Sequence, residues 1–208
     1  SFPTLEAFQA MMPAADQWPM SDSWAYHDWH QGKAGDVASF NKAMANRLGP
    51  PRDLADFEAK AQLLNYESHR AIFEGMNAGL FTRNSGRLLW MTQPAWPSTA
   101  WQIYSHDYDT HAAFFGAKKG SEPLHVQINL PDRALAVVNS LAKPLSGATL
   151  RVQTLALDGT RLEDRTVAVN VAGHAVASLG AAVPDALFAG APVVLTRLEL
   201  RASDGRLV

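Results

Sequence analysis

Aromatic residues divide this chain of 208 residues into two parts of different composition. All six Trp, all four Tyr and eight of the nine Phe precede Pro123, and only Phe188 follows it. The first part also holds all six Met, whereas the second is rich in Val, Leu, Ala and Thr. This change indicates a domain boundary near residues 120–124, and we predict two domains, residues 1–122 and 123–208.

The first part is predicted to be mostly helical. Apolar residues recur at helical spacing, and Thr4, Asp36 and Asp53 are placed to cap helices. One short apolar run, Leu88–Met91, fits a buried strand instead. The order helix, helix, strand, helix suits the end of a β/α barrel. The predicted helices cover residues 3–12, 36–48, 53–81 and 111–120.

Four polar residues of the longest predicted helix, Glu67, His69, Arg70 and Glu74, admit an acid–base interpretation. However, Glu67 and Arg70 are three residues apart, and Arg70 and Glu74 are four apart. That spacing is typical of ordinary ion pairs on a helix surface, which is the interpretation we favour.

The second part alternates polar and apolar residues, as half-buried strands do. Asp158-Gly159 and Asp204-Gly205 are typical hairpin turns between such strands. About seven short strands separated by turns predict an immunoglobulin-like β-sandwich, without the cysteines of an antibody domain. The predicted strands cover residues 125–130, 135–138, 149–157, a segment after Thr160, 166–171, 175–179 and 192–200.

The composition of the chain limits the classes of partner that we expect it to bind. A net charge of −2 gives no electrostatic basis for binding nucleic acid or an anionic membrane, and no apolar run has membrane-spanning length. The chain has no cysteine, so it has neither disulfides nor thiolate chemistry. His27, Asp28 and His30 match no strong metal-ligand spacing, so we expect no metal and no cofactor.

A Trp-rich stretch follows the predicted strand, where Pro94 and Pro97 exclude regular structure. Gln93, Trp96 and Trp101 lie there, at the carboxyl end of the strand, the place where β/α barrels keep their sites. Aromatic faces flanked by amides and hydroxyls suit sugars. The alternative is a Trp-rich packing corner.

Three stretches resemble glycoside hydrolase family 2, in the order in which that family has them. They are Phe40–Arg70, Leu88–Pro97 and Tyr108–Asn129. The chain is most similar to the exo-β-D-glucosaminidases and β-mannosidases, including the endo-β-mannosidases, over about residues 1–160.

The resemblance implies the carboxyl-terminal part of a larger enzyme. It implies multidomain α+β architecture, with the helical tail of a (β/α)8 barrel followed by the sandwich, and Leu88–Met91 as the eighth strand. A retaining glycosidase needs an acid/base and a nucleophilic carboxylate. In the family both precede the segment matched here, so this chain alone is expected to be inactive.

The implied substrate is a β-linked oligosaccharide or glycan, with mannoside or glucosaminide specificity and exo or endo action left open. The implied partner is the remainder of the parent enzyme, with self-association of the helices as a further expectation, and the implied compartment is the bacterial periplasm or exterior. A non-catalytic carbohydrate-binding or docking module is the alternative, disfavoured because the sandwich has one aromatic residue. The expected substrate-binding residues are Trp90, Gln93, Trp96, Trp101, Trp24, Tyr26 and His27.

Overall fold

The computed structural model describes residues 1–30, 37–99, 102–188, 190 and 193–208. It separates into two compact units. Unit 1 comprises Ser1–Phe73 and Leu88–Gly120, and unit 2 comprises Glu74–Arg87 and Ser121–Val208. The division therefore differs from the predicted one, because residues 74–87 belong with the second unit. No helix in the described ranges is long and apolar enough to span a membrane.

Helices make up the regular structure of unit 1, and the four expected ones are present. Thr4 Oγ1 accepts a hydrogen bond from the Ala7 amide (3.4 Å), and Asp53 Oδ1 accepts one from the Asp56 amide (2.8 Å), as expected of caps. The expected cap Asp36 lies outside the described residues. The elements are α1 (Leu5–Met11), η1 (Ala14–Asp16), α2 (Asp22–Tyr26), α3 (Val37–Leu48), α4 (Leu54–Asn77) and α5 (Ala112–Gly120).

The longest helix, α4, ends four residues before its predicted end. After Asn77 the chain turns at Gly79, whose carbonyl oxygen accepts from the amides of Arg83 and Asn84. The Asn84 side-chain amide also donates to the carbonyl oxygen of Met76 (3.0 Å), satisfying an end of the helix. On the helix surface, Glu67 forms an ion pair with Arg47 of α3 (2.7 Å). Glu67 thus forms an ion pair on the helix surface, which does not support a catalytic acid–base role for this residue.

An aromatic cluster forms the core of unit 1. Phe2 lies at its centre, with ring centroids 4.9 Å from Phe8, 5.6 Å from Trp24, 5.5 Å from Trp29 and 5.1 Å from Phe57. Stacked, tilted and edge-to-face pairs of this kind add to the stabilisation that burial provides. The apolar residues at helical spacing therefore cover one another within the unit. The remaining buried members are Met12, Met44, Ala61 and Leu64.

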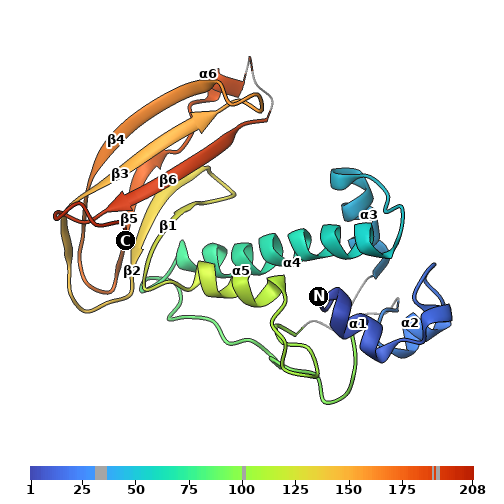
Figure 1. Cartoon of the computed structure of the whole chain (residues 1–208). Coiled ribbons are helices and arrows are strands. Elements are labelled where there is room, and N and C mark those ends of the chain that lie inside the picture. The colour runs from blue at the N-terminus through green and yellow to red at the C-terminus, as the bar shows by residue number, and fades with distance from the viewer. Residues whose placement is uncertain (31–36, 100–101, 189, 191–192) are drawn as a thin grey trace. The chain divides into compact units, whose positions relative to one another are not determined.

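Small residues let α5 pack closely against α4 (Figure 1). A Cβ on Gly116 would lie 2.2 Å from the carbonyl oxygen of Tyr66, and one on Gly120 would lie 2.7 Å from the Cβ of Phe73. Ala113 and Ala117 are buried on the same helix. The two backbones can approach to this distance only because glycine has no side chain.

The predicted buried strand Leu88–Met91 is wrong. The segment is irregular and Trp90 is 81% exposed, while Met91 has φ 59°, which breaks an extended backbone. A strand needs a hydrogen-bonded neighbour, and no strand in the described part of the chain pairs with these residues. The loop instead closes on itself, because the carbonyl oxygen of Thr92 accepts from the amides of Ile103 and Tyr104.

Two antiparallel three-stranded sheets form the body of unit 2 (Figure 1), in the orders β1-β2-β5 and β4-β3-β6. The residues predicted as two strands after Thr160 form the single strand β4, and Leu207 bridges to Arg201 in the expected final hairpin. The elements are β1 (Leu124–Ile128), β2 (Ala134–Asn139), β3 (Leu145–Leu155), β4 (Arg161–Val171), β5 (Ala175–Ala181), α6 (Asp185–Phe188) and β6 (Leu195–Arg201).

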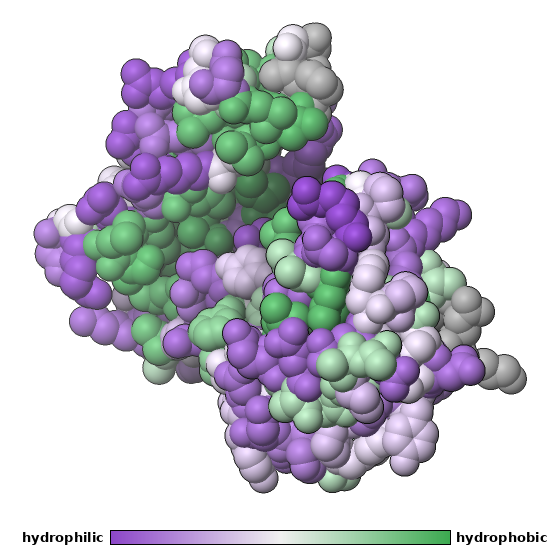
Figure 2. All heavy atoms as spheres, turned by 45° about the vertical axis from the view of Figure 1, so that its right-hand side comes forward, coloured by the Kyte–Doolittle hydropathy of each residue, from purple (hydrophilic) through white to green (hydrophobic). Residues whose placement is uncertain are grey.

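The inner faces of the two sheets share one aliphatic core. Leu135 and Val137 come from the first sheet, and Leu150, Val169 and Leu200 come from the second. This layering explains the alternation of polar and apolar residues read from the sequence. Apolar side chains also remain at the surface of unit 2, and Figure 2 shows them in green. Exposed leucines of this unit include Leu130, Leu157 and Leu195.

A buried polar network joins the end of α4 to β1. His125 places Nε2 3.1 Å from Glu74 Oε1 and Nδ1 3.3 Å from Glu122 Oε2. Gln127 donates to the carbonyl oxygen of Glu74 (2.8 Å) and accepts from the Asn77 side chain (3.2 Å). These bonds explain why the last residues of α4 belong to unit 2.

Candidate functional site

Three of the predicted site residues meet at the surface of unit 1. Tyr26 ends α2 and His27 follows it, whereas Trp96 lies in the loop between Pro94 and Pro97. The Trp96 ring stacks on His27 (centroids 5.5 Å apart, planes at 20°) and meets Tyr26 edge-on (5.4 Å, 81°). The structure thus brings together two segments separated by about seventy residues. We call Tyr26, His27 and Trp96 the aromatic platform.

Backbone hydrogen bonds hold the platform in place. His27 Nδ1 lies 2.8 Å from the carbonyl oxygen of Pro97 and donates to it, since a carbonyl oxygen only accepts. In return, the Thr99 amide and hydroxyl both donate to the carbonyl oxygen of His27 (2.9 and 2.7 Å). The proton on Nδ1 makes Nε2 of a neutral His27 a hydrogen-bond acceptor.

The platform faces solvent. Tyr26 is 73% exposed and Trp96 is 37% exposed, so both rings have surface to offer a ligand. An aromatic face matches the apolar C–H face of a pyranose, and the Tyr26 hydroxyl can bond to the sugar's hydroxyl rim. The three rings thus pack on one another and still leave aromatic surface exposed.

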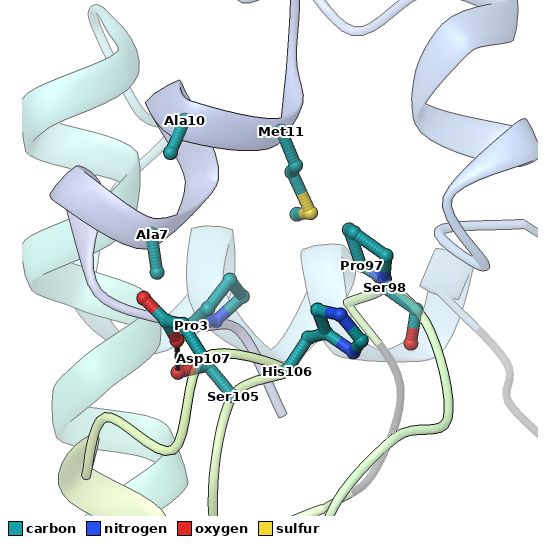
Figure 3. Close-up of a pocket in the computed structure, with 9 residues that line it drawn as sticks. All are labelled: Pro3, Ala7, Ala10, Met11, Pro97, Ser98, Ser105, His106 and Asp107. Carbon is teal, nitrogen blue, oxygen red and sulfur yellow. Dashed lines mark hydrogen bonds between the residues drawn. The ribbon is translucent and has the colours of Figure 1, made fainter.

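A small pocket adjoins the platform loop (Figure 3). Its volume is about 140 Å³. Such a space fits a substituent of a ligand, because pockets for whole drug-sized molecules run from about 300 to 1,000 Å³. Ala7, Ala10 and Met11 of α1 supply apolar walls, and the remaining lining residues are Pro3, Pro97, Ser98, Ser105, His106 and Asp107.

The rim of this pocket carries a carboxylate. Ser105 donates its hydroxyl to Asp107 Oδ1, and this bond lowers the pKa of the Asp107 carboxyl below its usual value. Asp107 is therefore ionised at neutral pH and can accept a hydrogen bond from a hydroxyl group or pair with an ammonium group. Gln93, a predicted site residue, donates to the carbonyl oxygen of His106 (3.0 Å) and so supports the rim.

The other predicted site residues have different places. Trp24 is 1% exposed, stacks on Phe2, and donates its indole N–H to the carbonyl oxygen of Asp16 (2.9 Å). It is a core residue, and its ring has almost no surface open to a ligand. Trp90 is largely exposed and lies outside both the platform and the pocket lining. Trp101 lies outside the described residues.

Sequence reasoning missed the pocket. Ala7, Ala10 and Met11 share a face of α1 through their spacing of three and four residues, and Ser105-His-Asp107 is a polar run directly after the Trp-rich stretch. Neither signal shows that the two segments meet. Over the described ranges there is no cluster of three or more His, Asp or Glu able to hold a metal ion.

Two curated relatives illustrate the likeness to known proteins. The chain is 35% identical over 213 residues to an exo-β-D-glucosaminidase of Streptomyces avermitilis, with 99% of the chain and 24% of the relative covered. It is 38% identical over 138 residues to a mannosylglycoprotein endo-β-mannosidase of Lilium longiflorum, with 66% and 14% covered. The chain thus spans 24% or less of the length of these relatives. No family model matches it.

Solved structures agree over the whole chain. The exo-chitosanase of Amycolatopsis orientalis superposes with a TM-score of 0.83 at 30% identity, with 100% of this chain and 25% of that chain covered. A β-D-mannosidase from Dictyoglomus thermophilum gives 0.81 at 14% identity, with the same coverage, which shows a shared fold alone.

Proposed function

We propose that the parent protein is a retaining glycosidase, because this chain belongs to glycoside hydrolase family 2 and matches the carboxyl-terminal part of its enzymes. Its substrates would be glycans with β-glucosaminidic or β-mannosidic bonds, the two linkages that its relatives' names contain. Within that enzyme the chain would supply part of the substrate-binding surface and an accessory sandwich.

In this proposal, unit 1 is the end of a (β/α)8 barrel and unit 2 is an immunoglobulin-like sandwich. The whole-chain superposition on the exo-chitosanase supports both assignments.

The aromatic platform would be a wall of a sugar subsite. Trp96 would stack on the C–H face of a pyranose, while His27 and Tyr26 fix the plane of its ring. The ionised Asp107 would suit the ammonium group of glucosamine near the small pocket. Gln93 would act by supporting the rim, and Trp90 and Trp101 stay predicted subsite residues.

The chain would hold neither catalytic carboxylate. Retention of configuration requires two carboxyl groups about 5–5.5 Å apart, one as acid/base and one as nucleophile. In the family that the sequence resembles, both belong to earlier segments. The platform would therefore bind sugar without cleaving it.

The observation that carries the proposal is the 35% identity over 99% of the chain to a named glycosidase. Its test is hydrolysis of p-nitrophenyl β-D-glucosaminide and β-D-mannoside by the full-length parent and by this chain alone. We expect turnover of at least one substrate by the parent and none by the chain. If the parent hydrolyses neither substrate, the proposal that it is a glycosidase is refuted. If this chain alone turns over either substrate, the proposal that both catalytic carboxylates lie outside it is refuted.

A further inference from the structure

We propose that unit 2 carries a second carbohydrate site, separate from the platform, that binds a neutral pyranose residue of a β-linked glycan. The site is a pocket between the turn after α4 and strand β5, with a volume of about 300 Å³. This volume reaches the range of about 300–1,000 Å³ that is typical of small-molecule sites. Its lining residues are Ala78, Leu80, Phe81, Thr82, Asn129, Ala136, His174, Ala175, Val176 and Ser178.

Two rings meet at this pocket. Phe81 and His174 pack edge to face with their centroids 5.6 Å apart, and Phe81 is 42% exposed. An exposed phenyl ring beside an imidazole offers a pyranose an apolar face and a polar edge. Phe81 belongs to the turn after α4 and His174 to the turn before β5, so the rings come from segments far apart in the sequence.

Both residues have left-handed backbones. Phe81 has φ 65° and His174 has φ 50°, conformations that favour glycine. Local bonds hold them, because Phe81 N donates to the carbonyl oxygen of Asn84 (2.9 Å) and His174 N donates to that of Leu141 (3.0 Å). Backbone strain of this kind is unfavourable in energy and is often found at ligand-binding sites. Two strained aromatic residues lining one pocket are therefore a stronger sign of a site than either alone.

Short polar side chains complete the lining. The Thr82 hydroxyl donates to the carbonyl oxygen of Gly79 (3.1 Å), so its lone pairs can accept from a sugar hydroxyl. Asn129 Oδ1 accepts from Gln127 (2.7 Å), which fixes its amide, and Ser178 adds a second hydroxyl. The lining residues in the described ranges include no carboxylate, ammonium or guanidinium group, which favours a neutral sugar over a glucosamine cation.

Composition does not predict this site, because Phe81 precedes the domain boundary that the change in composition indicates. Phe188 is the only aromatic residue of the sequence after Pro123, and so low an aromatic content disfavours sugar binding by the sandwich. The structure places Phe81 in unit 2. The low aromatic content after Pro123 is therefore no evidence against sugar binding at this pocket.

The proposal is tested by measuring the affinity of the full chain for β-1,4-mannohexaose by calorimetry and by locating the bound sugar from changes in amide chemical shifts. Phe81→Gly removes the ring while suiting the left-handed backbone, and we expect it to weaken binding by at least about five-fold, the size of one aromatic contact. Thr82→Val should weaken it less. Trp96→Ala, in unit 1, should leave the shifts of residues 78–82 and 174–178 intact. Fully deacetylated chitohexaose should bind this pocket more weakly than mannohexaose.

Absence of binding at millimolar mannohexaose would overturn the proposal, as would binding that Phe81→Gly leaves unchanged while far-ultraviolet circular dichroism shows an intact fold. The outcome is independent of the proposed glycosidase activity. A parent enzyme that hydrolyses its substrate while unit 2 binds no sugar refutes this site alone. Sugar binding by unit 2 in a parent without hydrolysis refutes the glycosidase alone.

Discussion

The imidazole of His27 lies almost parallel to the indole of Trp96, with centroids 5.5 Å apart and planes at 20°. Because Nδ1 of His27 bonds to the carbonyl oxygen of Pro97, the next residue after Trp96, the stack is fixed at both its ring and its backbone. A fixed ring loses little rotamer freedom when a ligand binds. Trp96 is thus preorganised to contact a flat ligand.

Replacing Trp96 by Ala in the parent enzyme should lower kcat/KM several-fold. One aromatic contact is worth on the order of 1 kcal/mol, which corresponds to about a five-fold change. The melting temperature should change little, since the ring is partly exposed. Phe115→Ala, at an exposed aromatic on α5, is the matched control and should leave the kinetics unchanged. A lower melting temperature with unchanged kinetics would assign Trp96 to packing.

Gly116→Ala should destabilise the chain. A Cβ there would lie 2.2 Å from the Tyr66 carbonyl oxygen, so α5 must shift away from α4, at a cost of about 1–3 kcal/mol. Gly75→Ala is the control, because a Cβ at Gly75 meets no atom within 4 Å and should stabilise α4 by up to about 1 kcal/mol. Urea unfolding followed by circular dichroism measures both. Equal midpoints for the two variants would contradict the close packing.

Replacing His125 by Leu should destabilise unit 2 by about 2–4 kcal/mol, because the mostly buried Glu74 carboxylate loses its contact with the imidazole. Glu122→Gln should cost less, since 40% of the Glu122 side chain is exposed, against 12% for Glu74. Hydrogen exchange of β1 amides reports the change locally. Unaltered protection of Val126 and Ile128 in the Leu variant would show that the network does not hold the strand.

Stability should fall as the pH drops from about 6.5 to about 4, through His111. Burial, with smaller contributions from the amino terminus and His69, lowers the pKa of His111 to about 4. The unfolded state, with a pKa near 6.5, therefore binds the proton first, and stability declines across this window by at most about 3 kcal/mol. In His111→Gln the acid slope of the unfolding free energy should flatten. His106→Gln, at an exposed position, should keep it; identical slopes in both variants would contradict the assignment.

Much of the fold follows from local patterns. Thr4 and Asp53 cap helices as predicted, and the alternation after Leu124 corresponds to the strands of two sheets. The prediction of a strand at Leu88–Met91 was wrong because an apolar run forms a strand only beside another strand. Sequence periodicity contains no information about that neighbour.

The candidate site was less accessible from sequence. Trp24 and Tyr26 lie two residues apart on α2, and this spacing turns them to different sides of the helix, one into the core and one to solvent. Composition could not tell them apart. The contact between His27 and Trp96, like the pocket beside it, depends on tertiary structure that joins α1, α2 and the Trp-rich loop.

Helix α4 contributes its last residues to unit 2, so neither unit is a continuous segment of the chain. A single recombination event at residue 120 would move the strands but leave Glu74 and Asn77 behind, so His125 would lose its contact with Glu74 and Gln127 its bonds to the end of α4. The sandwich is therefore a poor cassette for transfer between proteins. A transplant that keeps its stability must carry residues 74–87 along with residues 121–208, through a linker that replaces the intervening chain.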